Sequence, residues 1–115
     1  MRVFPWGDAP MNCNLVSSLG CTPAPPMAVD ARPLGAGPYG HEQLVGNAWE
    51  LAADFYSAPF ATTAVVDPGG PATASYRAVH GGGNGSANTL RSSSRSYVST
   101  SAYLATTSFR CARSL

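Results

Sequence analysis

The sequence predicts one small, loop-rich globular domain and disfavours a bundle of helices. The chain has 115 residues, the usual size of a single domain, and 44% of them are apolar, which is a globular composition. Glycine and proline, with 12 and 10 copies, make up 22 of the residues, and both interrupt helices more than other residues do. Only 11% of the residues are charged. This mixture predicts short regular segments joined by long irregular connections.

The charge pattern excludes several classes of partner. All seven basic residues are arginines, and six acidic residues leave a net charge of +1, so the chain has no basic footprint for nucleic acid or anionic lipid. No run approaches about 18 consecutive apolar residues, so no membrane span is expected. The start, Met1–Asp8, lacks the apolar stretch of a signal peptide, so no such leader is expected.

Residues 1–40 are predicted to be irregular. Seven of the ten prolines lie here, and each one removes a backbone donor and restricts the residue before it. A regular ladder of hydrogen bonds therefore cannot run through this part of the chain. We expect only short extended pieces, at Val3–Trp6 and Met27–Val29.

Residues 41–56 carry the first periodic segment, which has two interpretations. Its apolar residues fall on one helical face, which predicts a helix over His41–Tyr56. The pair Gly46-Asn47 in the middle breaks a helix at a cost of about 1 kcal/mol and indicates a turn. The second interpretation is a short helical turn that ends at Gly46, followed by a strand over Ala48–Asp54. The residues alone leave both interpretations open.

The C-terminal half is predicted to alternate loops and short strands. Residues 57–75 are predicted to be a loop with one apolar run, Ala64–Val66. Ser75–His80 alternates weakly and leads into three glycines, which predicts a strand that ends in a tight loop. Serine, threonine and asparagine dominate the last third of the chain, where two further strands are expected near Thr89–Ser96 and Ser108–Arg113.

The three cysteines allow one local pairing. Cys13 and Cys21 are eight positions apart. They either form a disulfide, in an oxidising compartment outside the cytoplasm, or are two reduced and packed thiols. Cys111 has no obvious partner, and no Cys-x-x-Cys pair or nearby histidine completes a metal site.

No catalytic constellation stands out from the residues alone. His41 and His80 have no pairing residue at ligand spacing, and no serine lies in a Gly-x-Ser-x-Gly elbow. The carboxylate of most interest is Glu50, because it lies beside Trp49 in a partly apolar segment. If it is buried, it must be paired, bound to a cation or hydrogen-bonded.

Six local motifs in a fixed order carry a family resemblance. They lie between residues 4 and 113 and so cover nearly the whole chain: FPWGD at 4–8, VGNAWEL at 45–51 with ADFY at 53–56, DPGGP at 67–71, RAVHGG at 77–82, LRSSSR at 90–95 and FRCA at 109–112. In this order the chain resembles the C-terminal part of the formylglycine-generating enzymes, also called sulfatase-modifying-factor domains.

The resemblance implies an α+β fold related to C-type lectins, with short twisted strands and much irregular backbone, in one domain over residues 1–115. It favours a strand for Ala48–Asp54. It also implies that the upstream half of the fold is missing, so that the chain is a fragment and Cys111 lacks an upstream partner. We therefore expect marginal stability and an exposed aromatic face, unless the upstream half or a partner chain covers it. The aromatic face consists of four residues: Trp6, Trp49, Phe55 and Phe109.

The activity of the family is not expected from this chain. The enzymes that it resembles oxidise a cysteine of a sulfatase peptide to formylglycine, and two cysteines after an Arg-Gly-Gly-Ser-aromatic motif hold copper for this reaction. The matching segment, His80–Leu90, contains no cysteine, so copper binding is not expected. The resemblance implies a non-catalytic binding module or degenerate paralogue, from a bacterium, with a protein or peptide as its ligand.

Two other functions stay open. One is a family oxidase that acts on a sulfatase-type cysteine, or in a related oxidation, through residues that the sequence does not identify. The other is a C-type-lectin-like ligand-binding protein with a diversified C-terminal surface. Residues 84–107 are dense in Ser, Thr, Asn, Tyr and Ala, and small polar and tyrosine side chains provide adaptable recognition chemistry.

The resemblance also implies a calcium site around the Gly-Asn-Ala-Trp-Glu segment. The ligands that it carries over are the Gln43 side chain, the carbonyls of Gly46 and Ala48, and the Glu50 carboxylate, all oxygen donors that suit Ca²⁺. The family usually has Asp or Asn where Gln43 stands, which makes this ligand weaker. The alternative is that Glu50 serves as a structural hydrogen-bond acceptor.

Overall fold

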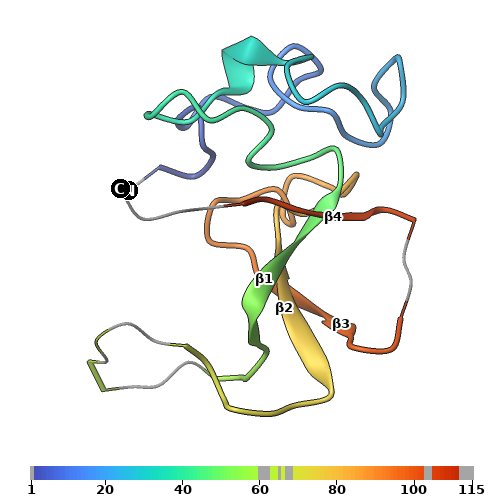
Figure 1. Cartoon of the computed structure of the whole chain (residues 1–115). Coiled ribbons are helices and arrows are strands. Elements are labelled where there is room, and N and C mark those ends of the chain that lie inside the picture. Colours follow the sequence, from blue (N-terminus) through green and yellow to red (C-terminus); the bar gives the residue numbers. More distant parts are fainter. Residues whose placement is uncertain (1, 60–62, 65, 67–68, 103–104, 112–115) are drawn as a thin grey trace.

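The computed structural model describes residues 2–59, 63–64, 66, 69–102 and 105–111. Figure 1 shows the irregular N-terminal segment gathered at one end of a small sheet. The regular elements within the described residues are one 3-10 helix, η1 (Pro33–Gly35), and four β-strands: β1 (Trp49–Phe55), β2 (Tyr76–His80), β3 (Ser96–Ser99) and β4 (Thr107–Phe109).

The four strands form one sheet in the order β3-β2-β1-β4. β1 pairs antiparallel with β2, and β2 pairs antiparallel with β3, whereas β4 runs parallel to β1. A parallel neighbour requires a long crossover, which here consists of β2, β3 and the loops around them. This topology brings the C-terminal strand beside the first one, so that Glu50 lies opposite His80 on one side and Ser108 on the other.

The chain turns sharply just before β1. Asn47 has a left-handed backbone, with φ at 63°, and its side-chain amide clamps the backbone of Met27. Asn47 Oδ1 accepts from the Met27 N–H at 2.6 Å, and Nδ2 donates to the Met27 carbonyl at 3.0 Å. A right-handed helix cannot pass through a residue held in this conformation. The helix predicted over His41–Tyr56 is therefore wrong, and the strand predicted for Ala48–Asp54 is confirmed as β1.

The strand predicted at Ser75–His80 is confirmed as β2, and the one predicted at Thr89–Ser96 is displaced. The chain forms a turn at the start of that range, because the N–H groups of Thr89 and Leu90 both donate to the Ser86 carbonyl. The turn buries the Leu90 side chain completely, and β3 starts only after it.

The last predicted strand, at Ser108–Arg113, corresponds to β4, which ends at Phe109. Part of that range, residues 112–113, lies outside the described residues, as does residue 65 of the apolar run Ala64–Val66. The N-terminal segment is irregular as predicted. Its extended piece Val3–Trp6 contributes one bridge, between Phe4 and Gly7, and Met27–Val29 is not a strand.

The main core cluster is built by loops rather than by the strands. Ser92 N–H donates to the Val3 carbonyl at 2.8 Å, which fixes the N-terminal segment against the loop after Leu90. Each large aliphatic or aromatic side chain that is buried in this cluster contributes about 1.5–3 kcal/mol to the free energy of unfolding. The buried members of the cluster come from four separate segments: Phe4, Val16, Val45 and Leu90.

The fold is mostly β. In the described part of the chain the one helical element is η1, so the helical component of the predicted α+β class does not appear there, whereas the short strands and long loops do. The same residues include no helix with the length and apolar character needed to cross a bilayer.

The aromatic face that was expected to be exposed is largely covered by neighbours from the chain itself. Trp6 is half-buried and stacks on Phe4, with ring centroids 4.9 Å apart and planes 7° from parallel. Phe55 is half-buried under the guanidinium of Arg77, which lies 4.2 Å from the ring centroid. Trp49 is also half-buried. Phe109, at 75% exposure, is the member of the group that matches the expectation.

Candidate functional site

The segment that matches the cysteine-bearing loop of the family is closed by tight backbone packing. Gly82 and Gly83 both have left-handed backbones, with φ at 70° and 52°. A Cβ at Gly82 would lie 2.2 Å from the Thr89 carbonyl oxygen, and one at Gly83 would lie 2.7 Å from Trp49 Cδ1. Only glycine fits at these two positions. The loop therefore packs directly on β1 and on the Thr89 turn.

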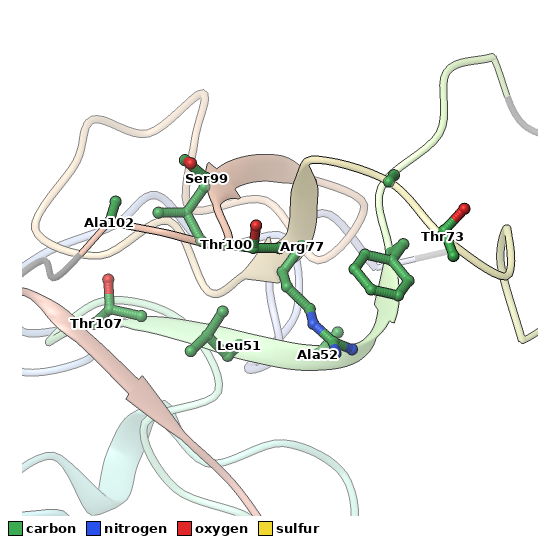
Figure 2. Close-up of a pocket in the computed structure, with 11 residues that line it drawn as sticks. Leu51, Ala52, Thr73, Arg77, Ser99, Thr100, Ala102 and Thr107 are labelled. Carbon is green, nitrogen blue, oxygen red and sulfur yellow. The ribbon is translucent and has the colours of Figure 1, made fainter.

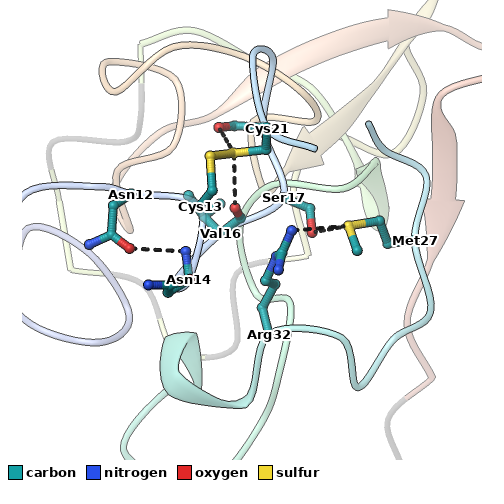
Figure 3. Close-up of a disulfide and its surroundings, with 9 residues drawn as sticks. Asn12, Cys13, Asn14, Val16, Ser17, Cys21, Met27 and Arg32 are labelled. Atoms are coloured by element: carbon teal, nitrogen blue, oxygen red, sulfur yellow. Dashed lines mark hydrogen bonds between the residues drawn. A yellow bond between two sulfur atoms is a disulfide. The ribbon is translucent and has the colours of Figure 1, made fainter. Parts of the chain in front are cut away.

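The structure offers no pair of thiolates for copper in its described residues. Cys13 and Cys21 are joined by a disulfide, with an S–S distance of 2.12 Å and a Cα–Cα distance of 5.4 Å (Figure 3). Cys111 is a free, exposed thiol. The segment His80–Leu90 contains no sulfur atom. These residues do not fit a copper ion held by two cysteines.

The loop closed by the disulfide is connected to the segment that follows it through Met27. Ser17 Oγ donates to Met27 Sδ at 3.2 Å, and Arg32 Nη2 lies 3.6 Å from the same sulfur atom (Figure 3). Met27 is in turn clamped by Asn47, immediately before β1. The disulfide therefore belongs to the scaffold that positions the start of the sheet.

Glu50 on β1 is bound by Arg110, which follows β4 directly. Arg110 Nη2 lies 2.6 Å from Glu50 Oε1, and its Nε donates to Oε2 at 3.2 Å. The same Nη2 donates to the backbone carbonyls of Glu42 and Gln43, each at 3.1 Å. The parallel pairing of β1 and β4 explains this geometry, because it places Ser108 opposite Glu50 and so brings Arg110 within reach.

All four residues of the predicted calcium site line one pocket of about 460 Å³, together with Arg110 and Cys111. Gln43 is buried; its Nε2 donates to the Ala28 carbonyl at 3.2 Å, and its Oε1 has no hydrogen-bond partner. The carbonyl of Gly46 accepts from the Ala48 N–H at 2.8 Å.

One of these groups fits a cation and another does not. Gln43 Oε1 is a buried oxygen atom without a hydrogen-bond partner, and such an oxygen is able to coordinate Ca²⁺. The Glu50 carboxylate, however, already binds the Arg110 guanidinium through both of its oxygen atoms, and it is the one carboxylate among the four proposed ligands of Ca²⁺. In this arrangement the charge of Glu50 is balanced by Arg110.

A second pocket, of about 590 Å³, lies over the sheet (Figure 2). Leu51 and Val98 give it apolar walls, and Arg77 stacks on Phe55 and donates from Nη1 to the Ala53 carbonyl. The register of β1 against β2 shifts between Leu51 and Phe55, and such bulges re-aim side chains beside binding sites. Hydroxyl groups complete the lining: Thr73, Ser99, Thr100 and Thr107.

Three tyrosines form a partly exposed cluster: Tyr76 on β2, Tyr97 on β3 and Tyr56, which directly follows β1. The ring of Tyr97 lies 4.9 Å from the rings of both Tyr56 and Tyr76. Tyr97 is 55% exposed and Tyr76 is 45% exposed. The guanidinium of Arg95 covers the Tyr56 ring at 4.6 Å. Of the three, only Tyr97 belongs to the polar segment 84–107 that the sequence singled out.

The two histidines do not form a metal site with the described acidic residues, although His80 lies opposite Glu50 in the sheet. His41 and His80 are exposed, and the described part of the chain contains no group of three or more His, Cys, Asp or Glu side chains that would hold a metal ion. The residue that the sequence reasoning missed at the site is Arg110. Its signal was the FRCA motif, but its partner Glu50 lies 60 positions away and no local pattern indicates the pairing.

The chain belongs to the family of sulfatase-modifying factor enzyme 1-like domains, whose sequence model matches residues 3–115. The family expected from the order of the six motifs is thereby confirmed.

Two known proteins are similar to this chain. A segment of 49 residues is 45% identical to hercynine oxygenase of Mycolicibacterium smegmatis and covers 43% of this chain and 11% of that protein. Treponema denticola variable protein 1 has a similar structure, with a TM-score of 0.77 at 21% identity, over 92% of this chain and 39% of that one. The second likeness confirms the fold. The matched region spans less than half of the length of each of these two proteins.

Proposed function

We propose that the chain is a non-catalytic, ligand-binding member of its family. The observation that carries the proposal is the cysteine-free segment His80–Leu90, whose glycines pack directly against Trp49 and Thr89. The family's copper chemistry needs two thiolates, and this segment supplies none. The free thiol, Cys111, lines a different pocket, beside Arg110.

The pocket over the sheet has a suitable composition for a peptide or protein ligand. Binding sites combine apolar walls with a few placed polar groups, and here Leu51 and Val98 accompany several hydroxyl groups and one guanidinium. Arg77 is held in place by Phe55 and by the Ala53 carbonyl, so its position is set before a ligand arrives. Such preorganisation favours affinity.

Selection of displayed random peptides on the purified chain tests this proposal. Enriched peptides are then measured on Leu51→Arg, which places a cation in the pocket, and on Leu34→Arg, a matched control whose side chain is 70% exposed outside it. We expect binding to be lost in Leu51→Arg alone. Equal binding by all three proteins, or no enrichment, contradicts the proposal.

A direct assay tests the absence of catalysis. The chain is incubated with a Cys-x-Pro-x-Arg peptide, copper and oxygen, and the peptide mass is followed. We expect no aldehyde to form, because no thiolate pair is available in the matching segment. Aldehyde formation that depends on copper would overturn this part of the proposal.

A family oxidase is the second candidate, favoured by the likeness to hercynine oxygenase. His41 and His80 are the nitrogen ligands that the sequence offers; a site of two histidines and one carboxylate would hold iron, but the described residues contain no group of three such side chains. Metal analysis of the isolated protein separates the two candidates. Stoichiometric iron or copper, with oxygen consumption, supports the oxidase.

The binding function has one specific form, a recognition protein with a diversified surface. It is supported by the likeness to a variable protein and by the tyrosines within the Ser- and Thr-rich segment 84–107. A nearby partial copy of this gene segment that differs only at adenines would support this form. If no such copy exists, the form is rejected and the simpler binding module remains.

A further inference from the structure

A third pocket, of about 450 Å³, lies between the N-terminal segment, the loop before β1, the end of β2 and the loop after Leu90. It shares no lining residue with the pocket over the sheet. Short backbone hydrogen bonds hold its walls together: Ser92 N–H to the Val3 carbonyl at 2.8 Å, and Gly46 N–H to the Gly81 carbonyl at 2.7 Å. The pocket is therefore part of the rigid scaffold.

Its floor is apolar. Phe4 and Val45 belong to the buried core, with exposures of 7% and 5%, and each presents part of its side chain to the pocket, as does Leu44. Tyr39 stands at the edge with 88% of its surface exposed, an unusual position for so large an aromatic side chain. A floor and wall of this kind favour a ligand with an apolar or aromatic body.

The charges that line the pocket have one sign. They are the guanidinium groups of Arg2 and Arg91, and none of the lining residues carries a carboxylate. Arg2 donates one N–H from Nη1 to the Pro5 carbonyl at 3.3 Å, which leaves its other donors available. The structure gives Arg91 no partner among the described residues. Two guanidinium groups in a pocket with no acid among its lining residues favour an anion, and the planar guanidinium can bind both oxygen atoms of a carboxylate.

We propose that this pocket binds a small carboxylate that carries an apolar or aromatic group. The carboxylate pairs with Arg91 and Arg2, and the apolar group lies on Phe4, Leu44 and Val45. The C-terminus of a peptide and a free organic acid share this chemistry. The proposal is independent of the proposed function, because it concerns a separate pocket and requires neither a peptide over the sheet nor the absence of catalysis.

The probes are N-acetyl-phenylalanine, its neutral amide, 3-phenylpropionate and inorganic phosphate. Binding is followed by tryptophan fluorescence, because Trp6 stacks on Phe4 in the pocket floor, and by calorimetry. We expect at least one of the two aromatic acids to bind, and the amide to bind about tenfold more weakly or not at all. A preference for N-acetyl-phenylalanine identifies a peptide terminus, and a preference for 3-phenylpropionate identifies a free acid.

Arg91→Gln should weaken binding of the acid about tenfold, whereas Arg95→Gln, four positions along and outside the pocket, should change it less than about twofold. Arg91→Lys keeps the charge but loses the planar guanidinium, so its affinity for the acid should lie between those of the other two variants. Equal affinity for the acid and the amide, equal binding by Arg91→Gln, phosphate as tight as the aromatic acids, or no binding up to about 10 mM would each overturn the proposal.

Discussion

Replacing Arg110 by alanine should be among the most damaging single changes outside the core. The guanidinium makes two charged contacts to Glu50, at 2.6 and 3.2 Å, and two to the carbonyls of Glu42 and Gln43, at 3.1 Å. These contacts join β1, the loop before it and the end of β4. No other described side chain connects these three parts of the chain in this way.

The magnitude follows from the exposure of the pair. The Arg110 and Glu50 side chains are 37% and 20% exposed, so the pair lies between an open surface pair, which contributes about 0–1 kcal/mol, and a buried one, whose rupture costs about 3–5 kcal/mol. We expect Arg110→Ala to lower the free energy of unfolding by about 2 kcal/mol. Arg110→Lys keeps the charge but cannot bind both carboxylate oxygens in the same planar geometry, so we expect it to lower the free energy of unfolding by about 1 kcal/mol.

Urea unfolding followed by tryptophan fluorescence measures these values, with Arg91→Ala as the control, because Arg91 is exposed and has no partner among the described residues. A double-mutant cycle with Glu50→Gln should give a coupling energy of about 1 kcal/mol or more. A coupling energy below about 0.5 kcal/mol would refute the reasoning, since it would reduce the contact to an ordinary surface pair.

Four further predictions follow from other contacts. Calcium chloride should leave the melting temperature of the wild-type chain unchanged. It should raise the melting temperature of Arg110→Ala, because this substitution frees the Glu50 carboxylate. A rise in the wild-type melting temperature that is lost in Glu50→Gln would contradict this prediction. Gly82→Ala should lose more than about 2 kcal/mol in urea unfolding, and Gly69→Ala, where a Cβ meets nothing, less than about 0.5 kcal/mol. Asn47→Ala should lose about 2 kcal/mol, more than Asn47→Asp, which keeps the acceptor for Met27. Cys13→Ser with Cys21→Ser should lose about 2–3 kcal/mol of the free energy of unfolding, the value expected for a loop of this length, and a protein that is equally stable after reduction would contradict this.

The local elements of the fold were predictable where a short pattern decides them. β2 was expected from its alternation and the glycines after it, and the irregular N-terminal segment was expected from its prolines. Helical periodicity misled for residues 41–56, because the decisive feature is Asn47, whose left-handed backbone depends on a clamp to Met27 twenty positions earlier. The strand prediction succeeded there through the family motif and not through the apolar pattern.

The residues of the candidate site could be predicted from the sequence, whereas its contact with Arg110 could not. The motif that resembles a calcium site does bring Gln43, Gly46, Ala48 and Glu50 into one pocket. The cation that the structure places there is the side chain of Arg110, which reaches Glu50 only through the parallel pairing of β1 with β4. Sequence reasoning on single segments cannot find such a contact, because register between distant strands is set by the whole sheet.

The exclusive use of arginine over lysine fits the scarcity of regular structure in this chain. Long loops leave many carbonyl groups outside any ladder, and a planar guanidinium is able to bind a carbonyl while it stacks on a ring. Arg77 does this with Ala53 and Phe55, and Arg95 does it with Ser57 and Tyr56.

Arg110 joins two loop carbonyls to Glu50 in the same manner, so the arginines act as cross-links between segments that the short strands cannot hold together. Against that pattern Arg91 is the exception, since no partner within the described part of the chain binds its guanidinium and it lies over an apolar floor in a pocket without acids. Arg77, Arg95 and Arg110 each hold a backbone carbonyl of another segment, whereas Arg91 does not, so its guanidinium is well suited to bind an anion from outside.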